Sequence, residues 1–482
     1  MKRRLFPVCV LLMCLTGLLT ACIDDSFTTS PNDVLSFSAD TVNFDTIFTN
    51  EGSATRSFKV YNHSNKSLRI SSIRLAKGGE SGFIVNVDGL SGVDFENTEL
   101  RGRDSLFVYV IANIAETGEL QPVEARDSLV FVTNGVTQHV KLLAQTQDAH
   151  RVRGLVINSD SVITAEKPII VYDSLVVAPD VTLTLEPGVT LYMHNSARID
   201  VYGRLLAEGV QGMPVTIRGD RLDRMFDNLP YNNLAGQWAG IRFHEGSFDN
   251  RLTHAMVRGT TWGIVCDSTD LSRTTLTIHN SIIHNSTANL IDVACNRVKI
   301  TNSELSDAGG AVFAMRKGVA ELTHCTLVNY YFYDMIQGAI VTTPTAEELM
   351  EWGVELSLNN CLIAGNAAPL SVGDFTGCEV YLNSCMIAGA DGSDDANFIH
   401  TLWNGEPMFW LIDRENYLYD YRIGSPESPA IGWGATAYAI DSTATDMYGE
   451  SRLNRIDVGA YQFTVTSPYY EEEAEEDASV VQ

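Results

Sequence analysis

Six segments of the sequence align without a gap, and they decide the fold class. They read NRLTHAMV (250–257), LTIHNSII (276–283), VKITNSEL (298–305), AELTHCTL (320–327), LSLNNCLI (356–363) and VYLNSCMI (380–387). Every copy has an aliphatic residue in its third and last places and a small residue in its sixth. The small residues are 26, 22, 22, 36 and 24 positions apart. A period near 22 is too short for a strand–helix unit but suits one coil of a β-solenoid.

The fifth place of the repeat is polar in all six copies. Its occupants are His254, Asn280, Asn302, His324, Asn360 and Ser384. Asparagine tolerates the left-handed backbone region. We therefore expect this column at the bend between two strands of each coil, with stacked side chains hydrogen-bonded along the solenoid axis.

The sixth place contains three of the nine cysteines, Cys325, Cys361 and Cys385. The same place holds Ala or Ser in the other copies, so small size is what the position requires. Cβ atoms stacked at about 4.8 Å are further apart than those of a disulfide. We predict three buried, reduced thiols. The pairing of Cys266, Cys295 and Cys378 stays open.

The seventh place points outward if strand side chains alternate. It reads Met256, Ile282, Glu304, Thr326, Leu362 and Met386, whereas the fourth place is polar throughout. An apolar outward column predicts either a partner or a cover supplied by the chain itself. The candidate partner-binding residues are Met256, Ile282, Leu362 and Met386. At Leu362 and Met386 we expect the insertion at 329–353 to form the cover.

The flanking segments resemble right-handed parallel β-helix surface proteins of the pectate-lyase-like type. LTLEPGVTL (183–191), VYGRLLAEG (201–209), PVTIR (214–218) and QWAGIRF (237–243) resemble their first coils. YDYRIGSPESPAIG (419–432) and DVGAYQ (457–462) resemble their closing segment. The resemblance implies a right-handed parallel β-helix over 151–422 and a closing segment over 423–466. The acidic run EEEAEED (471–477) predicts a disordered tail over 467–482.

Residues 35–148 alternate apolar and polar side chains in short stretches punctuated by Gly, Asn and Asp, which is typical of a β-sandwich. The string VNFDTIFTNEGSATRSFKVYNHSNKSLRISSI (42–73) resembles the immunoglobulin-like domains of the ASPM/HYDIN/major-sperm-protein type. That resemblance implies a spacer or docking module. The expected fold class is all-β, an immunoglobulin-like sandwich followed by the β-helix and its C-terminal cap.

The N-terminus predicts export. Lys2, Arg3 and Arg4 precede an apolar run too short to span a bilayer, and the run ends in Leu-Thr-Ala-Cys (19–22). This resembles a bacterial lipobox, with 1–21 as signal peptide, Cys22 as the lipidated residue and 22–34 as tether. An ordinary signal peptide with a coincidental cysteine is the alternative. Asp24-Asp25 resembles a signal for the outer face of the outer membrane.

The net charge is -27, with 33 Lys and Arg against 60 Asp and Glu. So acidic a surface repels phosphate backbones, so we expect no nucleic-acid partner. The expected partners are the outer membrane, through the lipid, and either an outer-membrane protein complex or an extracellular glycan.

Catalysis and metal binding have little support in the sequence. The paired-carboxylate motifs of polygalacturonase-type hydrolases are missing, and no carboxylate column stands beside a base, as a lyase needs. The loop with Asp391, Asp394 and Asp395 resembles half a calcium site, although Ala396 stands where an EF-hand requires Gly. A flexible acidic loop is the other interpretation, and no other cofactor is expected.

Two aromatic insertions interrupt the repeat, at 329–353 and 391–422. The first includes Thr345 and Glu348, whose capping-box spacing predicts a short helix. The second carries Trp403, Phe409, Trp410 and Tyr417. These rings are candidates either to stack on sugars or to cap the open end of the solenoid.

A recurrent Asp-Ser or Asp-Thr pair resembles an O-glycosylation sequon of some Gram-negative lineages. Its candidate hydroxyls are Thr41, Thr46, Ser105, Ser128, Ser161, Ser174, Ser268 and Ser442. Asp-Ser turns before strands explain the pattern equally well.

Together these features favour a non-enzymatic surface lipoprotein whose β-helix is a rigid binding scaffold. A polysaccharide-active lyase or hydrolase and a structural spacer are the alternatives.

Overall fold

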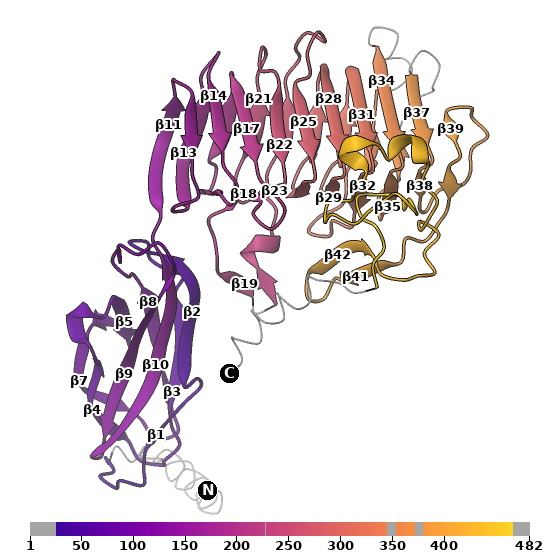
Figure 1. The fold of residues 1–482 in the computed structure, drawn as a ribbon. Helices are drawn as coiled ribbons and strands as arrows, with labels where there is room; N and C mark the ends of the chain where they lie inside the picture. Colours follow the sequence, from indigo (N-terminus) through magenta and orange to yellow (C-terminus); the bar gives the residue numbers. More distant parts are fainter. Residues whose placement is uncertain (1–25, 227, 345–352, 372–378, 466–482) are drawn as a thin grey trace, which may run out of the picture. The chain divides into compact units, whose positions relative to one another are not determined.

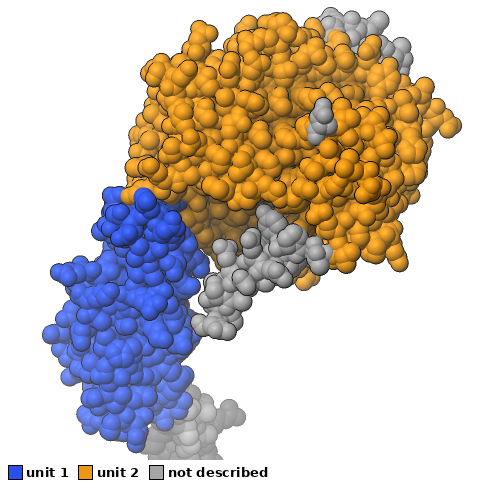
Figure 2. Space-filling view, viewed as in Figure 1, with its two compact units in different colours: residues 1–148 blue, residues 149–482 orange. Residues whose placement is uncertain are grey.

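The computed structural model describes residues 26–226, 228–344, 353–371 and 379–465. The chain forms two compact units, residues 1–148 and 149–482, which Figure 2 colours separately. Within the described residues no helix is long and apolar enough to cross a membrane. The signal peptide, Cys22, Asp24-Asp25, the 345–348 capping box, Cys378 and the acidic tail lie outside the described residues.

The first unit consists of two five-stranded sheets. One contains, in spatial order, β1 (Leu35–Phe37), β3 (Arg56–Asn62), β8 (Ser105–Ala112), β5 (Phe83–Val87) and β6 (Leu90–Gly92). The other contains β2 (Thr41–Phe48), β10 (Val136–Gln147), β9 (Val123–Thr133), β4 (Leu68–Leu75) and β7 (Asp94–Leu100). Alternate residues of the strands, such as Leu106, Val108 and Val110, enter a shared core. A short 3-10 turn, η1 (Gly78–Glu80), follows β4.

The second unit is a parallel solenoid with three faces (Figure 1). Face A comprises β12 (Ser161–Ile163), β14 (Thr182–Leu185), β17 (Arg204–Glu208), β22 (Asn250–Thr253), β25 (Leu276–His279), β28 (Asn296–Thr301), β31 (Gly318–Thr323), β34 (Val354–Asn359), β37 (Glu379–Asn383) and β39 (Phe398–Ile399). Each strand pairs in parallel with the equivalent strand of the next coil.

Faces B and C belong to one 18-stranded sheet, which also includes β11 (His150–Ile157) and the long β13 (Ile169–Val177). Face B continues with β15 (Thr190–Met193), β18 (Val215–Gly219), β23 (Ala255–Thr260), β26 (Ile282–Ser286), β29 (Glu304–Ala308), β32 (Thr326–Asn329), β35 (Leu362–Gly365), β38 (Met386–Ile387) and β40 (Leu402–Trp403). Face C continues with β16 (Arg198–Val201), β21 (Gly240–Phe243), β24 (Ile264–Cys266), β27 (Ile291–Val293), β30 (Phe313–Met315), β33 (Val341–Thr342) and β36 (Leu370–Ser371).

Short elements lie beside the coils. They are the hairpin β19–β20 (Arg224–Phe226 and Leu229–Pro230), η2 (Tyr231–Asn233), the hairpin β41–β42 (Phe409–Asp413 and Leu418–Ile423), η3 (Thr436–Tyr438) and η4 (Asp441–Thr443).

The register confirms the six-copy alignment residue by residue. Third-place Leu252 pairs with Ile278, which pairs with Ile300, and the ladder continues to Leu382. The last-place residues form a second ladder from Val257 to Ile387. Both ladders belong to one buried core, so the repeat is the inward wall of the solenoid.

The fifth-place residues occupy the bend between faces A and B, as predicted. All six have a positive φ, between 42° and 53°. The Asn280 side chain hydrogen-bonds His254 at 3.1 Å, and that of Asn360 hydrogen-bonds His324 at 3.0 Å. The ladder is not continuous, because the Asn302 amide donates instead to the carbonyl of Thr445 at 2.8 Å.

Residues 423–465, the closing segment, lie along face B and not over the end of the solenoid (Figure 1). The amide of Gly459 donates to the Asn360 carbonyl at 2.8 Å, and that of Ala460 donates to the Thr326 hydroxyl at 3.0 Å. The Asn360 side-chain amide donates to the Ala435 carbonyl, and the Ala435 backbone amide donates to the Asn360 side-chain oxygen. The bend column therefore also anchors the closing segment.

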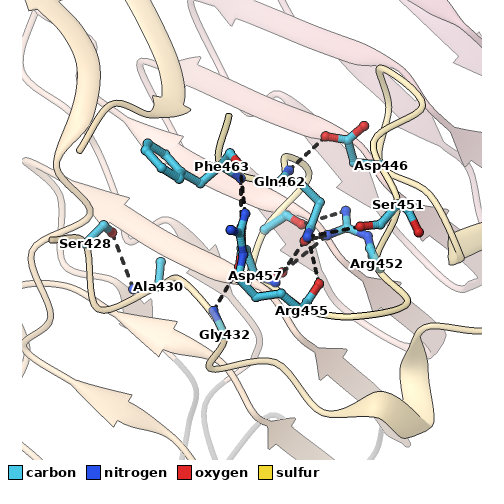
Figure 3. Close-up of polar contacts among 11 residues, drawn as sticks. Ser428, Ala430, Gly432, Asp446, Ser451, Arg452, Arg455, Asp457, Gln462 and Phe463 are labelled. Carbon is cyan, nitrogen blue, oxygen red and sulfur yellow. Dashed lines mark hydrogen bonds and ion pairs between the residues drawn. The ribbon is translucent and has the colours of Figure 1, made fainter. Parts of the chain in front are cut away.

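A buried arginine holds the closing segment together (Figure 3). Arg452 is 0% exposed and donates to the Gln462 side chain at 2.9 Å and to the Ala460 carbonyl at 3.1 Å. Its other acceptors are the carbonyls of Asp457 and Gly459 and the Asn302 side chain. Burial lowers the pKa of Arg452 to about 10, so it stays charged at neutral pH.

The cysteines of the repeat are free and buried, as the alignment predicted. Cys325, Cys361 and Cys385 are each 0% exposed. Their thiols donate to backbone carbonyls; that of Cys385, for example, lies 3.3 Å from the Leu358 oxygen. Burial raises the pKa of Cys325 and Cys385 well above the usual range. Cys266 and Cys295 are also free.

Candidate functional site

An open cleft of about 550 Å³ lies at the corner between faces B and C. We call it the aromatic cleft. Its lining residues are Trp262, Val265, Thr287, Ala288, Asn289, Asp292, Gly309, Gly310, Tyr331, Tyr333, Asp334, Met335 and Gln337. The coils supply the floor, and the insertion after β32 supplies a wall. Lysine and arginine are absent from this lining among the described residues.

The floor of the aromatic cleft is held rigidly by the solenoid. Val265 and Asp292 are neighbours in the outward column of face C. Asn289 donates to the Asp292 carboxylate at 3.0 Å, and Arg316 pairs with its other oxygen at 3.0 Å. Trp262 covers Gly240, where an added Cβ would come within 2.4 Å of the indole ring. Glycine at 240 therefore lets the indole approach the backbone of the coil closely, and Trp262 remains 36% exposed.

The aromatic wall of the cleft is braced from behind. Tyr333 stacks on Tyr417 with ring centroids 6.4 Å apart, and its hydroxyl donates to the Asn233 carbonyl at 2.5 Å. Phe332 packs against both Tyr333 and Tyr417, 4.3 and 5.2 Å from their ring centres. Burial raises the pKa of Tyr333. The wall therefore presents neutral, fixed rings.

A second cavity, of about 230 Å³, lies where the hairpin β41–β42 meets face B. We call it the cap cavity. It is lined by Asn232, Asn233, Met256, Arg258, Ile282, His284, Glu304, Leu411, Tyr417, Leu418, Tyr419, Asp420, Tyr421, Arg422, Tyr448 and Tyr461. Four segments that are far apart in the sequence surround it: the coils, η2, the hairpin and the closing segment.

The acidic groups of the cap cavity are all engaged. Glu304 accepts hydrogen bonds from Ser306 at 2.7 Å and from the Tyr461 hydroxyl. Burial, which outweighs these bonds, raises the pKa of Glu304. Asp420 forms an ion pair with Arg422, which approaches it through two guanidinium nitrogens. With Arg258 and Arg422 beside Asp420 and Glu304, the cavity presents charged groups of both signs.

His284 and Asp307 lie together beneath the cap cavity. His284 Nδ1 is 3.6 Å from Asp307 Oδ2, which also accepts from the Tyr421 hydroxyl at 2.7 Å. Burial lowers the pKa of His284 to about 3 and raises that of Asp307 to about 7. A void of about 10 Å³ beside them also touches Asn233, Tyr331, Tyr333 and Tyr419. Because its lining overlaps with those of both larger sites, the aromatic cleft and the cap cavity are neighbours.

The candidate partner-binding column divides into two halves. Met256 and Ile282 are half-buried and line the cap cavity. Leu362 and Met386 are 1% and 0% exposed, packed with Tyr421, Ile423 and Val458. They are therefore unavailable to a partner. The cover comes mainly from the β41–β42 hairpin and the closing segment, which corrects the expected role of the 329–353 insertion; of that insertion, Tyr330 joins the cluster.

The four candidate aromatic residues of the second insertion lie in different parts of the second unit. Trp403 packs against Phe398 at 4.8 Å on the last coil and against the solenoid core. Phe409 packs against Tyr421 at 5.5 Å in the cover of face B. Tyr417 lines the cap cavity, and Trp410 is half-buried in β41.

The candidate calcium loop is exposed at Asp391, Asp394 and Asp395. The Asp395 carboxylate accepts a hydrogen bond from the backbone amide of Asn397 at 2.9 Å. In the part of the chain that the structure describes, no three His, Cys, Asp or Glu side chains form a group able to hold a metal ion.

The O-glycosylation candidates differ in exposure. Ser268 and Ser442 are exposed; Thr41, Thr46, Ser105, Ser128, Ser161 and Ser174 are half-buried.

The sequence did not point to several residues of these sites. Trp262 lies outside the repeat, and Arg258, His284 and Asp420 resemble ordinary surface residues of strands. The outward column did reveal Met256, Ile282 and Glu304, because it passes through the cap cavity. Proximity to Tyr448 and Tyr461 depends on how the closing segment docks, for which the repeat gives no signal.

No family model matches the chain, and no curated protein matches it. Solved structures match parts of it. A protein of unknown function from Porphyromonas gingivalis W83 is 11% identical over 26% of this chain and 50% of its own, with a TM-score of 0.19. A family 123 glycoside hydrolase from Clostridium perfringens is 6% identical over 24% and 30%, with a TM-score of 0.17.

The periplasmic chaperone SfaE is 17% identical over 24% of this chain and 58% of its own, with a TM-score of 0.18. The chain thus spans between 30% and 58% of these three structures. At such TM-scores the similarities assign neither a fold nor a function.

Proposed function

We propose that the protein is a lipid-anchored cell-surface protein whose β-helix binds neutral glycan in the aromatic cleft. In this proposal the solenoid is right-handed and pectate-lyase-like, and the first unit is an immunoglobulin-like spacer between it and the outer membrane. The aromatic cleft is the observation that carries the proposal.

The chemistry of the cleft matches that of a sugar chain. The rings of Trp262 and Tyr333 line the cleft, and aromatic rings offer surfaces on which the C–H faces of sugar rings pack. Asn289, Gln337 and the carboxylates Asp292 and Asp334 line the same space and accept or donate hydrogen bonds. Asp334 and Asp292 are the charged groups of the described lining, and Arg316, which pairs with Asp292, lies outside it. Such a lining disfavours uronates and sulfated sugars, so neutral glycan is the ligand class.

Binding to an array of neutral and acidic glycans tests the proposal, using the full chain in detergent. We expect neutral glycans to bind and Trp262→Ala to weaken binding about fivefold, since a lost stacking contact is worth about 1 kcal/mol. Tyr381→Ala is the matched control, because Tyr381 is a 41% exposed ring on face A. The proposal is wrong if no glycan binds or if both substitutions weaken binding equally.

The anchor is tested separately. Metabolic labelling with a palmitate analogue should mark the wild type and not Cys22→Ala, because the thiol of Cys22 is the proposed attachment site. Equal labelling of the two would contradict lipidation. Protease added to intact cells should digest the protein, and protection from that protease would contradict outward exposure.

A further inference from the structure

We propose that the cap cavity is a second binding site, which takes a single neutral sugar residue. The choice of ligand class rests on the proposed glycan binding, but the site is separate from the aromatic cleft. No sequence motif marks it, because its walls come from η2, three coils, the β41–β42 hairpin and the closing segment.

The size of the cap cavity suits one sugar ring. Its volume of about 230 Å³ corresponds to seven or eight water molecules at about 30 Å³ each. Ile282 and Met256 form an apolar part of the floor, while Tyr417 and Tyr419 approach from the hairpin. A sugar ring has the same division between an apolar face and a polar rim.

Some buried polar atoms of the lining have no hydrogen-bond partner in the part of the chain that the structure describes. The side-chain oxygen of Asn232 and the hydroxyl of Tyr419 have no hydrogen-bond partner among the described residues, although both atoms are buried. An unsatisfied buried polar group costs about 1–3 kcal/mol, so such a group calls for an explanation. Hydroxyl groups of a sugar would donate to the Asn232 oxygen and exchange a bond with Tyr419.

The charged groups of the lining are of both signs. Arg258 and Arg422 line the cavity together with Asp420 and Glu304; Arg422 is paired with Asp420, and Glu304 is held by Ser306 and Tyr461. An added anion would face Asp420, and an added cation would face Arg258 and Arg422. An uncharged polyol meets neither repulsion and uses both as hydrogen-bond partners.

Saturation-transfer NMR with free glucose, galactose, mannose and N-acetylglucosamine tests this site in the full chain. We expect at least one sugar to bind the wild type and the control Tyr381→Ala. Ile282→Trp should abolish that binding, because the larger ring fills the cavity from its floor. Trp262→Ala should leave that binding unchanged, because Trp262 lines the aromatic cleft and not the cap cavity.

Each outcome decides the matter. If binding survives in Ile282→Trp, or if none of the four sugars binds the wild type, the inference is wrong. If Trp262→Ala alone abolishes binding, the sugar occupies the aromatic cleft; the proposed function then stands and the second site does not. Should thermal denaturation show Ile282→Trp unfolded, Met256→Trp fills the same cavity from the neighbouring coil and replaces it.

Discussion

Faces A and B are made by the same coils, yet their outward columns differ. The face A column reads Arg251, Thr277, Lys299, Glu321, Ser357 and Tyr381, and all six are exposed or half-buried. The equivalent face B column reads Met256, Ile282, Glu304, Thr326, Leu362 and Met386, and its last four members are buried. Face A meets solvent, while face B is covered by the hairpin and the closing segment.

The difference shows what a repeat can and cannot encode. An apolar outward column indicates that something covers it, because exposed apolar stripes of that size are unusual on a monomer. The identity of the cover depends on matched polar groups elsewhere. Here Asn302 and Asn360 bind backbone of the closing segment, while Arg452 ties that segment together and bonds Asn302. Face B is therefore a scaffold for the cap cavity.

The largest test of this comparison is Arg452→Ala. The substitution removes five hydrogen bonds that the buried guanidinium donates, so we expect a loss of about 3–5 kcal/mol in the free energy of unfolding. Denaturation followed by tryptophan fluorescence measures it for the second unit alone, because all 6 tryptophans lie there. Arg251→Ala on face A is the matched control and should change stability by less than about 0.5 kcal/mol. Similar losses in both variants would contradict the comparison.

A second test uses the pH dependence of the pair under the cap cavity. Unfolded Asp and His titrate near about 3.9 and 6.5, whereas the folded pKa values are about 7 for Asp307 and about 3 for His284. Between about pH 4 and 6.5 the folded pair carries its proton on Asp307 and the unfolded pair carries it on His284. The numbers of bound protons are equal, so the wild-type pair adds no pH dependence there.

Each single variant should reveal the pH dependence of the one titrating residue that remains. In Asp307→Asn only His284 titrates, and it binds a proton in the unfolded state but not in the folded state, so the free energy of unfolding rises with pH. In His284→Gln only Asp307 titrates, and it binds a proton in the folded state but not in the unfolded state, so the free energy of unfolding falls as the pH rises. The slopes approach about 1.4 kcal/mol per pH unit with opposite signs. Glu304, Arg258 and Tyr421 face the pair in every variant. Their contribution to the pH dependence cancels when the wild-type slope is subtracted from the slope of each variant. Slopes of the same sign in the two variants would show that the pair is not buried as described.

The third test concerns how closely the closing segment approaches face B. Gly459 has φ +97°, and an added Cβ would lie 2.6 Å from Thr326 Oγ1 and 3.2 Å from Leu362 Cβ. We expect Gly459→Ala to cost about 1–3 kcal/mol in unfolding free energy. Gly246→Ala is the control, since Gly246 also has a positive φ but no atom within 4 Å of an added Cβ. Equal losses would mean that backbone strain, and not the contact with face B, determines the effect.

The sequence predicts the inward wall of the solenoid well and its cover poorly. Leu252 and Val257 could be assigned to the core because the same chemistry recurs once per coil. Asn302 and Asn360 could be assigned to a bend, and both have positive φ. Their hydrogen bonds to Thr445 and Ala435 were not predictable. The same residue, Asn, stands in the repeat whether its amide bonds along the ladder or binds a distant segment.

The candidate sites follow the same division. Met256 and Ile282 are in the cap cavity because the outward column passes through it, so half of that site could be predicted. Trp262 could not, because its position depends on the bare backbone of Gly240 in the preceding coil. Asp420 likewise reaches the cavity only through the fold of the hairpin.

The smallest expected effect is on face A. Lys299 Nζ lies 3.5 Å from the Glu321 carboxylate on the next strand, and the two side chains are 50% and 47% exposed. Water screens such a pair and fixing two long side chains costs entropy, so a double-mutant cycle with Lys299→Ala and Glu321→Ala should give a coupling of at most about 0.5 kcal/mol. Raising the salt concentration should reduce it further. A coupling above about 1 kcal/mol that persists in high salt would mean that the bare face also helps to hold the solenoid. The contrast with face B would then be one of degree, because both outward columns would contribute to stability and only their partners would differ.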